Sequence, residues 1–249
     1  MVWAFMLSMP SPARGIAINP LACAADDGWL RASGIWATAS WYPWDRELSF
    51  SIKMGGFLEL IRGNSKSAAI VASSEVISSS PGGMISFHPL AVRWEEGILI
   101  TGPAESAFWQ TGFLHSCKHD VDTLRRILVG TRLLGGILGE HAQGFACLYL
   151  YRTDYPEARE GRLLWSLGAR ASWASEEVFA TGGIVLFAYK DGLGLDALGR
   201  TGGFTRGQGA SFAGFLEYER AHDSGLYGKP KAKGHFGIGL GSWAKGVIF

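Results

Sequence analysis

A strict alternation of apolar and polar side chains constrains the fold of this chain more than any other feature. It spans residues 47–61 and 162–173, returns in 211–220, and is weaker in 127–134. In the first stretch Phe50, Ile52 and Met54 share one parity, while Ser51 and Lys53 share the other. A period of two predicts β-strands with one apolar and one polar face. These runs are longer than the strands of most soluble proteins.

Clusters of turn-forming residues separate the runs and indicate an antiparallel meander. Glycine supplies 35 of the 249 residues and punctuates many short elements. We expect further strands at residues 35–42, 68–76, 85–94, 97–101, 107–117, 145–152, 183–189 and 236–249. The glycine-rich segment 192–209 is predicted to be a long mobile loop. No stretch carries a capped helical stripe. The pattern therefore predicts an all-β chain, a single antiparallel up-and-down barrel of 10–12 strands, with twelve preferred.

Alternation alone fits a barrel in water as well as one in lipid. Three features favour lipid, and with it a transmembrane β-barrel. The runs reach the roughly 9–11 residues that a tilted membrane strand needs. Aromatic residues such as Trp41, Trp94 and Trp173 stand at the ends of runs, as in interfacial girdles. The opposite parity carries charges that would be expensive in hydrocarbon, about 2–4 kcal/mol for Arg or Lys at the midplane.

We therefore expect the charged parity to face the lumen. The predicted lumen-facing residues are Glu47, Lys53, Glu59, Arg132, Arg162, Arg170, Glu217 and Glu219. They would suit a wet lumen, but both signs are present, so they could also pair across a narrow interior and plug it.

Charge and cysteine content exclude several other classes of protein. Lys and Arg total 23 against 22 Asp and Glu, so no basic surface predicts nucleic-acid binding. Three cysteines without C-x-x-C spacing argue against a disulfide framework or a structural zinc site. No motif predicts a cofactor or a bound metal. No apolar run is long enough for a transmembrane helix. Residues 1–33 read as an N-terminal segment, a remnant of an export signal peptide, and residues 34–249 as the barrel.

The C-terminal residues add a resemblance to a known class. The chain ends at Phe249, with Val247 and Trp243 at alternate positions before it, although Lys245 stands where an apolar residue is commoner. This pattern resembles the last strand of bacterial outer-membrane β-barrels. The resemblance implies location in the bacterial outer membrane and contact with membrane lipid or lipopolysaccharide. A partner protein of the cell envelope is a further expectation.

The densest cluster of reactive side chains occupies residues 115–122. The stretch Gly112-Phe113-Leu114-His115-Ser116-Cys117 resembles the G-x-x-H-x-S strand of outer-membrane phospholipase A and lipid A deacylase barrels. The resemblance implies a His that activates a nucleophile two residues on, which here is Cys117, and Lys118 replaces the Asn that often follows. A thiolate beside His115 is a competent nucleophile, and Asp120 or Asp122 could orient the imidazole. The predicted catalytic residues are therefore His115, Cys117 and Asp120.

Three functional hypotheses follow. The first is a non-catalytic protein of the cell envelope with a structural or partner- or ligand-binding role, and the sequence favours it. The second is a hydrolase of lipid A or phospholipid acyl esters that uses His115 and Cys117. The third is a soluble barrel that holds an apolar ligand against Leu48, Phe50 and Ile52.

Overall fold

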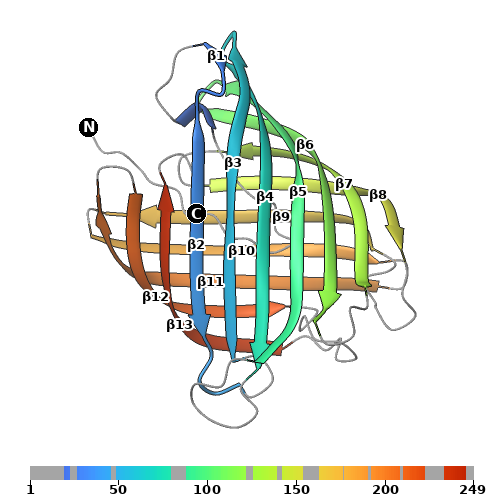
Figure 1. The fold of residues 1–249 in the computed structure, drawn as a ribbon, viewed down its shortest axis with the longest axis vertical. Coiled ribbons are helices and arrows are strands. Elements are labelled where there is room, and N and C mark those ends of the chain that lie inside the picture. The colour runs from blue at the N-terminus through green and yellow to red at the C-terminus, as the bar shows by residue number, and fades with distance from the viewer. Residues whose placement is uncertain are drawn as a thin grey trace.

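In the computed structural model, twelve antiparallel strands close into an up-and-down barrel, as the alternation predicted (Figure 1). The structure describes residues 20–22, 27–45, 49–79, 88–121, 126–138, 142–153, 163–175, 177–189, 192–207, 210–221 and 233–244. The strands of the ring are β2 (Ser33–Trp41), β3 (Phe50–Gly63), β4 (Lys66–Ser79), β5 (His88–Ala104), β6 (Ala107–Asp120), β7 (Arg126–Leu138), β8 (Ala142–Thr153), β9 (Leu163–Ala174), β10 (Val178–Tyr189), β11 (Gly192–Arg206), β12 (Ala210–Ala221) and β13 (Lys233–Ala244).

Each strand pairs with the next along the chain, and β13 pairs with β2 to close the ring. A short strand, β1 (Gly28–Trp29), pairs with the end of β3, and a 3-10 turn, η1 (Pro20–Ala22), precedes it. No helix in the described part of the chain is long and apolar enough to cross a membrane.

Two expectations from the sequence are wrong about individual strands. The segment predicted as a mobile loop at 192–209 contains β11, which is paired along its length with β10 and β12. Its glycines weaken the strand signal, but tight packing demands one of them, because a Cβ at Gly202 would lie 2.0 Å from the carbonyl oxygen of Gly214. Residues 88–94 of the first predicted run and the run predicted at 97–101 belong to the single strand β5, and residues 85–87 lie outside the described residues.

The apolar parity faces outward. Along β3, Lys53 and Glu59 are 1% and 0% exposed, whereas Met54 and Leu58 are 48% and 43% exposed. The opposite order would be needed for a soluble barrel that buries its apolar face around a ligand. The structure contradicts that hypothesis, which placed Phe50 and Ile52 on the same parity as Met54; Leu48 lies outside the described residues.

The two ends of the barrel differ in the length of their connections. At one end the strands are joined through residues 64–65, 105–106, 139–141, 175–177 and 207–209, and we call this the short-turn end. At the other, the long-loop end, they are joined through residues 42–49, 80–87, 121–125, 154–162, 190–191 and 222–232. Outer-membrane barrels have this asymmetry, with short periplasmic turns and longer extracellular loops.

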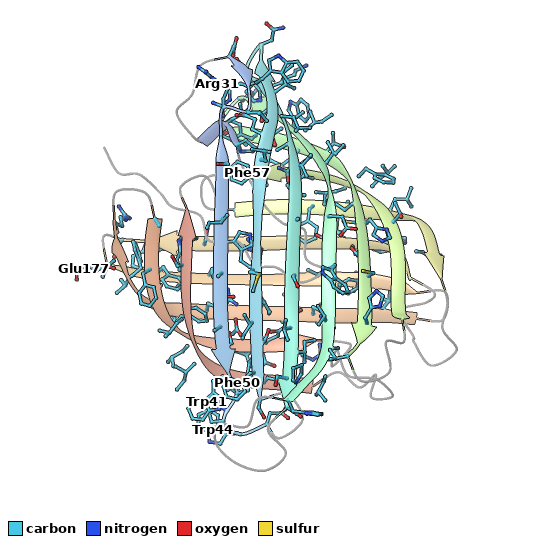
Figure 2. The ribbon with its side chains drawn as sticks, in the orientation of Figure 1. Arg31, Trp41, Trp44, Phe50, Phe57 and Glu177 are labelled. Atoms are coloured by element: carbon cyan, nitrogen blue, oxygen red, sulfur yellow. The ribbon has the colours of Figure 1, made fainter. Side chains whose placement is uncertain are left out.

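Exposed aromatic side chains mark both ends. Trp41 stacks on Phe50 with ring centroids 6.5 Å apart, and Trp44 lies near them at the long-loop end (Figure 2). Trp29 and Trp173 are exposed at the short-turn end. Rings at these positions match the two interfacial girdles of a membrane barrel.

The interior is filled in the half nearer the short-turn end. A buried apolar cluster there draws side chains from most strands of the ring, among them Trp36, Phe57, Leu99, Leu114 and Phe215. Inward-facing glycines of β13 make room for it. For example, a Cβ at Gly239 would lie 2.2 Å from the ring of Phe215. Among the described residues, the side chains of this cluster therefore occupy the interior of that half of the barrel.

A charge on the outer wall should be costly if that wall faces lipid. Ile184 lies midway along β10 and is 56% exposed. We expect Ile184→Arg to lower the free energy of unfolding in phospholipid vesicles by about 2–4 kcal/mol. Ile184→Val should change it by less than about 1 kcal/mol. Denaturant titration followed by tryptophan fluorescence measures both, and equal stability of the two variants would contradict a lipid-facing wall.

Candidate functional site

Three of the residues predicted to face the lumen, Lys53, Glu217 and Glu219, belong to a paired network in the barrel interior. We call Lys53, Glu75, Arg93, Arg200, Glu217 and Glu219 the interior charge cluster. Lys53 Nζ lies 3.4 Å from Glu75 Oε1 and 3.2 Å from Glu219 Oε2. Arg93 Nη1 lies 3.4 Å from Glu75 Oε2, and Arg200 pairs with Glu217. The cluster joins β3, β4, β5, β11 and β12 across the inside of the ring, and its cations and carboxylates balance in number.

Side chains from the loop after β2 cover this cluster. The Tyr42 hydroxyl donates to Glu217 at 2.5 Å and contacts Glu219 at 3.2 Å. Burial, reinforced by the nearby Glu217 and Glu219 carboxylates, raises the pKa of Tyr42 well above its usual value, so the phenol stays a donor. Asp45 Oδ2 lies 2.6 Å from Nδ1 of His235.

A second interior pair lies at the short-turn end. The Arg62 guanidinium donates to Glu59 at 2.8 Å and to the carbonyl oxygen of Pro20 at 2.5 Å, which ties η1 to the barrel. Arg170 is buried on β9. Glu47, Arg162 and the side chain of Arg132 lie outside the described residues. The described members of the predicted set are thus buried, and those of the two networks are paired.

The predicted catalytic residues lie elsewhere, on the wall of β6. Leu114 and Ser116 are buried, at 0% and 4% exposure, so His115 and Cys117 project from the opposite, outer face. Both are half-buried there. The Ser116 hydroxyl donates to Glu95 at 2.9 Å inside the barrel and is turned away from His115. Positions two apart on one strand face are separated by about 7 Å.

The strand register places two further polar residues beside His115. Glu96 on β5 is its partner on one side, and Thr131 on β7 is its partner on the other. Residues directly opposite in antiparallel strands have Cβ atoms about 4.5–5.5 Å apart. His115 Nδ1 lies 3.4 Å from Thr131 Oγ1. Glu96, His115 and Thr131 therefore lie side by side across three strands of the outer wall, and Cys117 lies two residues further along β6.

Sequence reasoning missed Glu96 and proposed Asp120 as the acidic helper. Asp120 lies at the end of β6, opposite Ala91, and its side chain lies outside the described residues. Glu96 occupies the outward parity of β5, which otherwise carries exposed Trp94, Ile98 and Ile100. The sequence signal that could have identified Glu96 is a carboxylate among the outward-facing apolar residues of one strand. An ionisable residue at membrane depth is a functional-site hypothesis in itself.

The site lies in the half of the wall nearer the long-loop end. Cys117 is three residues from the end of β6 at Asp120, or about 10 Å along the strand. Trp94 is the β5 partner of Cys117, and its ring meets His119 edge-on with centroids 5.0 Å apart. Aromatic rings at this level favour the interfacial zone, where lipid ester groups and water are both present.

Comparison with solved structures identifies the fold. Outer membrane phospholipase A from Escherichia coli superposes with a TM-score of 0.56 at 10% identity, over 92% of this chain and 96% of that one. The calcium-bound dimer of the Salmonella typhi outer membrane phospholipase gives 0.56 at 9% identity, over the same shares of the two chains. No family model and no curated protein matches the sequence. The chain thus has the fold of a bacterial outer-membrane β-barrel.

The two described cysteines offer a test of which face each side chain occupies. Cys117 is half-buried on the outer wall, whereas Cys147 is 3% exposed within the interior apolar cluster. In a Cys23→Ser background we expect an apolar maleimide to label Cys117 of the folded barrel in detergent and to spare Cys147 until the barrel is unfolded. Mass spectrometry of the peptides reads this out. Labelling of Cys147 first would overturn the assignment of faces.

Proposed function

We propose that this protein is an outer-membrane β-barrel that hydrolyses acyl esters of membrane lipids on its outer wall. Cys117 is the nucleophile and His115 is the general base. The observation that carries the proposal is that the two lie on one lipid-facing side of β6, with His115 flanked by Thr131 and Glu96. A reactive pair on an apolar wall is best placed for a substrate that arrives through the membrane.

The chemistry follows from the side chains. His115 takes the proton of the Cys117 thiol, and the thiolate attacks the ester carbonyl carbon. The carbon–oxygen bond to the alcohol breaks, the imidazolium protonates the leaving alkoxide, and an acyl thioester remains on Cys117. Water, deprotonated by His115, then attacks the thioester, which releases the fatty acid and restores the thiol. The hydroxyl of Thr131 holds the imidazole through Nδ1, which leaves Nε2 for the proton transfers.

Several findings support a location in the outer membrane and a lipid substrate. The apolar parity faces outward, aromatic rims border both ends, and the loops are longer at one end. The superposed neighbours are phospholipases by name, and the sequence of β6 resembles the G-x-x-H-x-S strand with Cys117 at the nucleophile position.

A second candidate function is a non-catalytic envelope barrel with a structural or partner-binding role. The filled interior favours it, because such a role needs no site beyond the fold. In that case His115 and Cys117 would be ordinary members of an interfacial strand end.

Removing the thiol should separate the two candidates. We expect the refolded protein in mixed micelles to hydrolyse phospholipid or p-nitrophenyl esters, and Cys117→Ala to lower kcat about a hundredfold or more, since the nucleophile is lost. Cys147→Ala and Ser116→Ala serve as matched controls that leave the outer wall unchanged. Activity of the wild type that is unaffected by Cys117→Ala would reject the proposed nucleophile, and absence of esterase activity would favour the non-catalytic role.

The filled interior predicts electrical behaviour as well. In planar lipid bilayers we expect the inserted barrel to show no steady conductance of the kind an open porin gives, because the interior charge cluster and the apolar cluster occupy the cross-section. Lys53→Ala combined with Glu219→Ala removes one cross-barrel pair and should raise the frequency of transient openings. A large constant conductance from the unmodified protein would contradict a closed interior.

A further inference from the structure

The row that contains His115 continues across the outer wall in the other direction. The register pairs Glu96 with Ala72 on β4, Ala72 with Gly56 on β3, and Gly56 with Ile35 on β2. Five neighbouring strands, β2 to β6, thus present Ile35, Gly56, Ala72, Glu96 and His115 in one line. The line crosses the strands and leads from an apolar side chain to the reactive pair.

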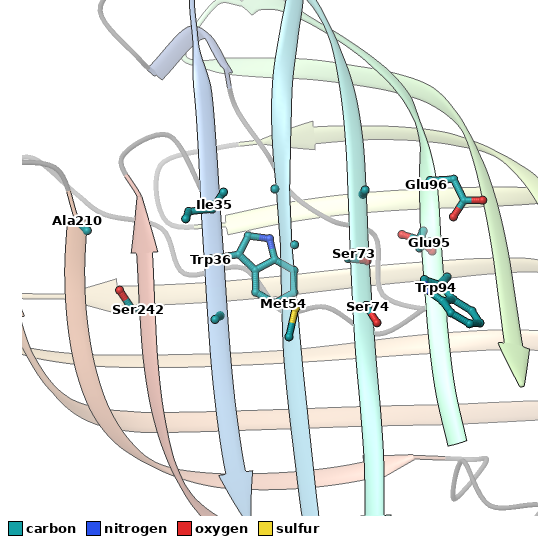
Figure 3. Close-up of a pocket in the computed structure, with 14 residues that line it drawn as sticks. Ile35, Trp36, Met54, Ser73, Ser74, Trp94, Glu95, Glu96, Ala210 and Ser242 are labelled. Atoms are coloured by element: carbon teal, nitrogen blue, oxygen red, sulfur yellow. The ribbon is translucent and has the colours of Figure 1, made fainter. Parts of the chain in front are cut away.

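The small residues of this line form the floor of a groove. A hollow of about 660 Å³ lies over β2 to β5 and reaches β13 at Ser242 and β12 at Ala210 (Figure 3). Gly56, Ala72 and Ser74 are among the residues that line it. Ile35 and Met54 flank it, and Trp94 and Glu96 lie at the β5 end. Gly56 is held close to its neighbour, since a Cβ there would lie 2.7 Å from the carbonyl oxygen of Gly34. Close packing of the two strands therefore excludes a larger side chain at Gly56, which keeps the groove open there.

The dimensions of the groove suit a single extended hydrocarbon chain. Strands of a sheet are about 4.8 Å apart, so the three steps from Gly56 to His115 span about 14 Å. The lining is mostly apolar, with serine hydroxyls such as those of Ser74 and Ser242 among the apolar residues, and its charge on the outer face is Glu96, next to His115. An acyl chain laid over Gly56 and Ala72 would bring its carboxyl end to the reactive pair.

The charge at the groove favours a lipid chain over a second copy of the barrel. A flat wall pressed onto the groove would bury the Glu96 carboxylate, and the residues that line the groove include no cation to pair with it. Burying a carboxylate away from water is costly unless a cation pairs with it. A flexible chain covers the apolar floor and leaves Glu96 at the interface with the polar head of the lipid.

We propose that this groove binds the acyl chain of the lipid substrate and that Ala72 sets the length of chain accepted. The inference rests on the proposed function for the reaction itself, but binding in the groove can be observed without turnover.

The first test measures binding in a variant that lacks the nucleophile. A photoactivatable fatty acid is added to Cys117→Ala in detergent micelles, and the adducts are mapped by mass spectrometry. We expect adducts on β3 and β4 around Met54 and Ala72, lost in Cys117→Ala/Ala72→Leu and kept in Cys117→Ala/Ala169→Leu. Ala169 is a matched exposed alanine on β9, outside the groove. Adducts spread evenly around the barrel, or crosslinks between two barrels through this face, would overturn the proposal.

The second test measures chain-length selectivity. In the active protein, Ala72→Leu should lower kcat/KM for p-nitrophenyl palmitate about tenfold or more relative to Ala169→Leu, and leave that for the butanoate ester within about twofold. An equal loss for both esters, or no loss for either, would overturn the role of Ala72 while the proposed hydrolase stands. If no Cys117-dependent activity exists, the proposed function fails, and the adduct map alone decides whether the groove binds acyl chains.

Discussion

The rest of this structure depends on one constraint: in a hydrocarbon medium every backbone amide and carbonyl must find its partner within the protein. A sheet meets that requirement only if its first and last strands pair, as β2 and β13 do here. Once the ring is closed, alternate side chains along each strand point outward, where they contact lipid, or inward, where they pack against one another. Charge placement, aromatic rims and the position of reactive groups all follow from that division.

The inward-facing side chains differ between the two halves of the barrel. Near the short turns, apolar rings and branched chains fill the space as they would in a small soluble core. Near the long loops, Lys53, Glu75 and Glu219 lie with Arg93, Arg200 and Glu217 in a mutually compensating set. Breaking one member of such a set leaves a buried charge uncompensated, which is far more costly than the net worth of the pair. The charged half therefore fixes the relative positions of strands that lie far apart in the sequence.

Much of the fold could be predicted from the sequence because period-two patterns are local. The outward parity of Met54 and Trp165 and the number of strands follow from neighbours along the chain. β11 could not be recognised in this way, since its glycines hide the alternation and only the ladders on both sides hold it as a strand. The site shows the same limit. His115 and Cys117 share a strand and could be found together, whereas Glu96 and Thr131 come to His115 through cross-strand register, which the sequence alone does not specify.

Under the proposed function, the outward placement of His115 and Cys117 has a kinetic consequence. A reactive group on the wall of a barrel meets its reactants by lateral diffusion in two dimensions, at their mole fraction in the bilayer instead of their concentration in the surrounding water. Diluting the membrane with inert lipid would then slow encounter even when the total amount of substrate is unchanged, and lipid packing beside β5 and β6 would govern access as much as any side chain does.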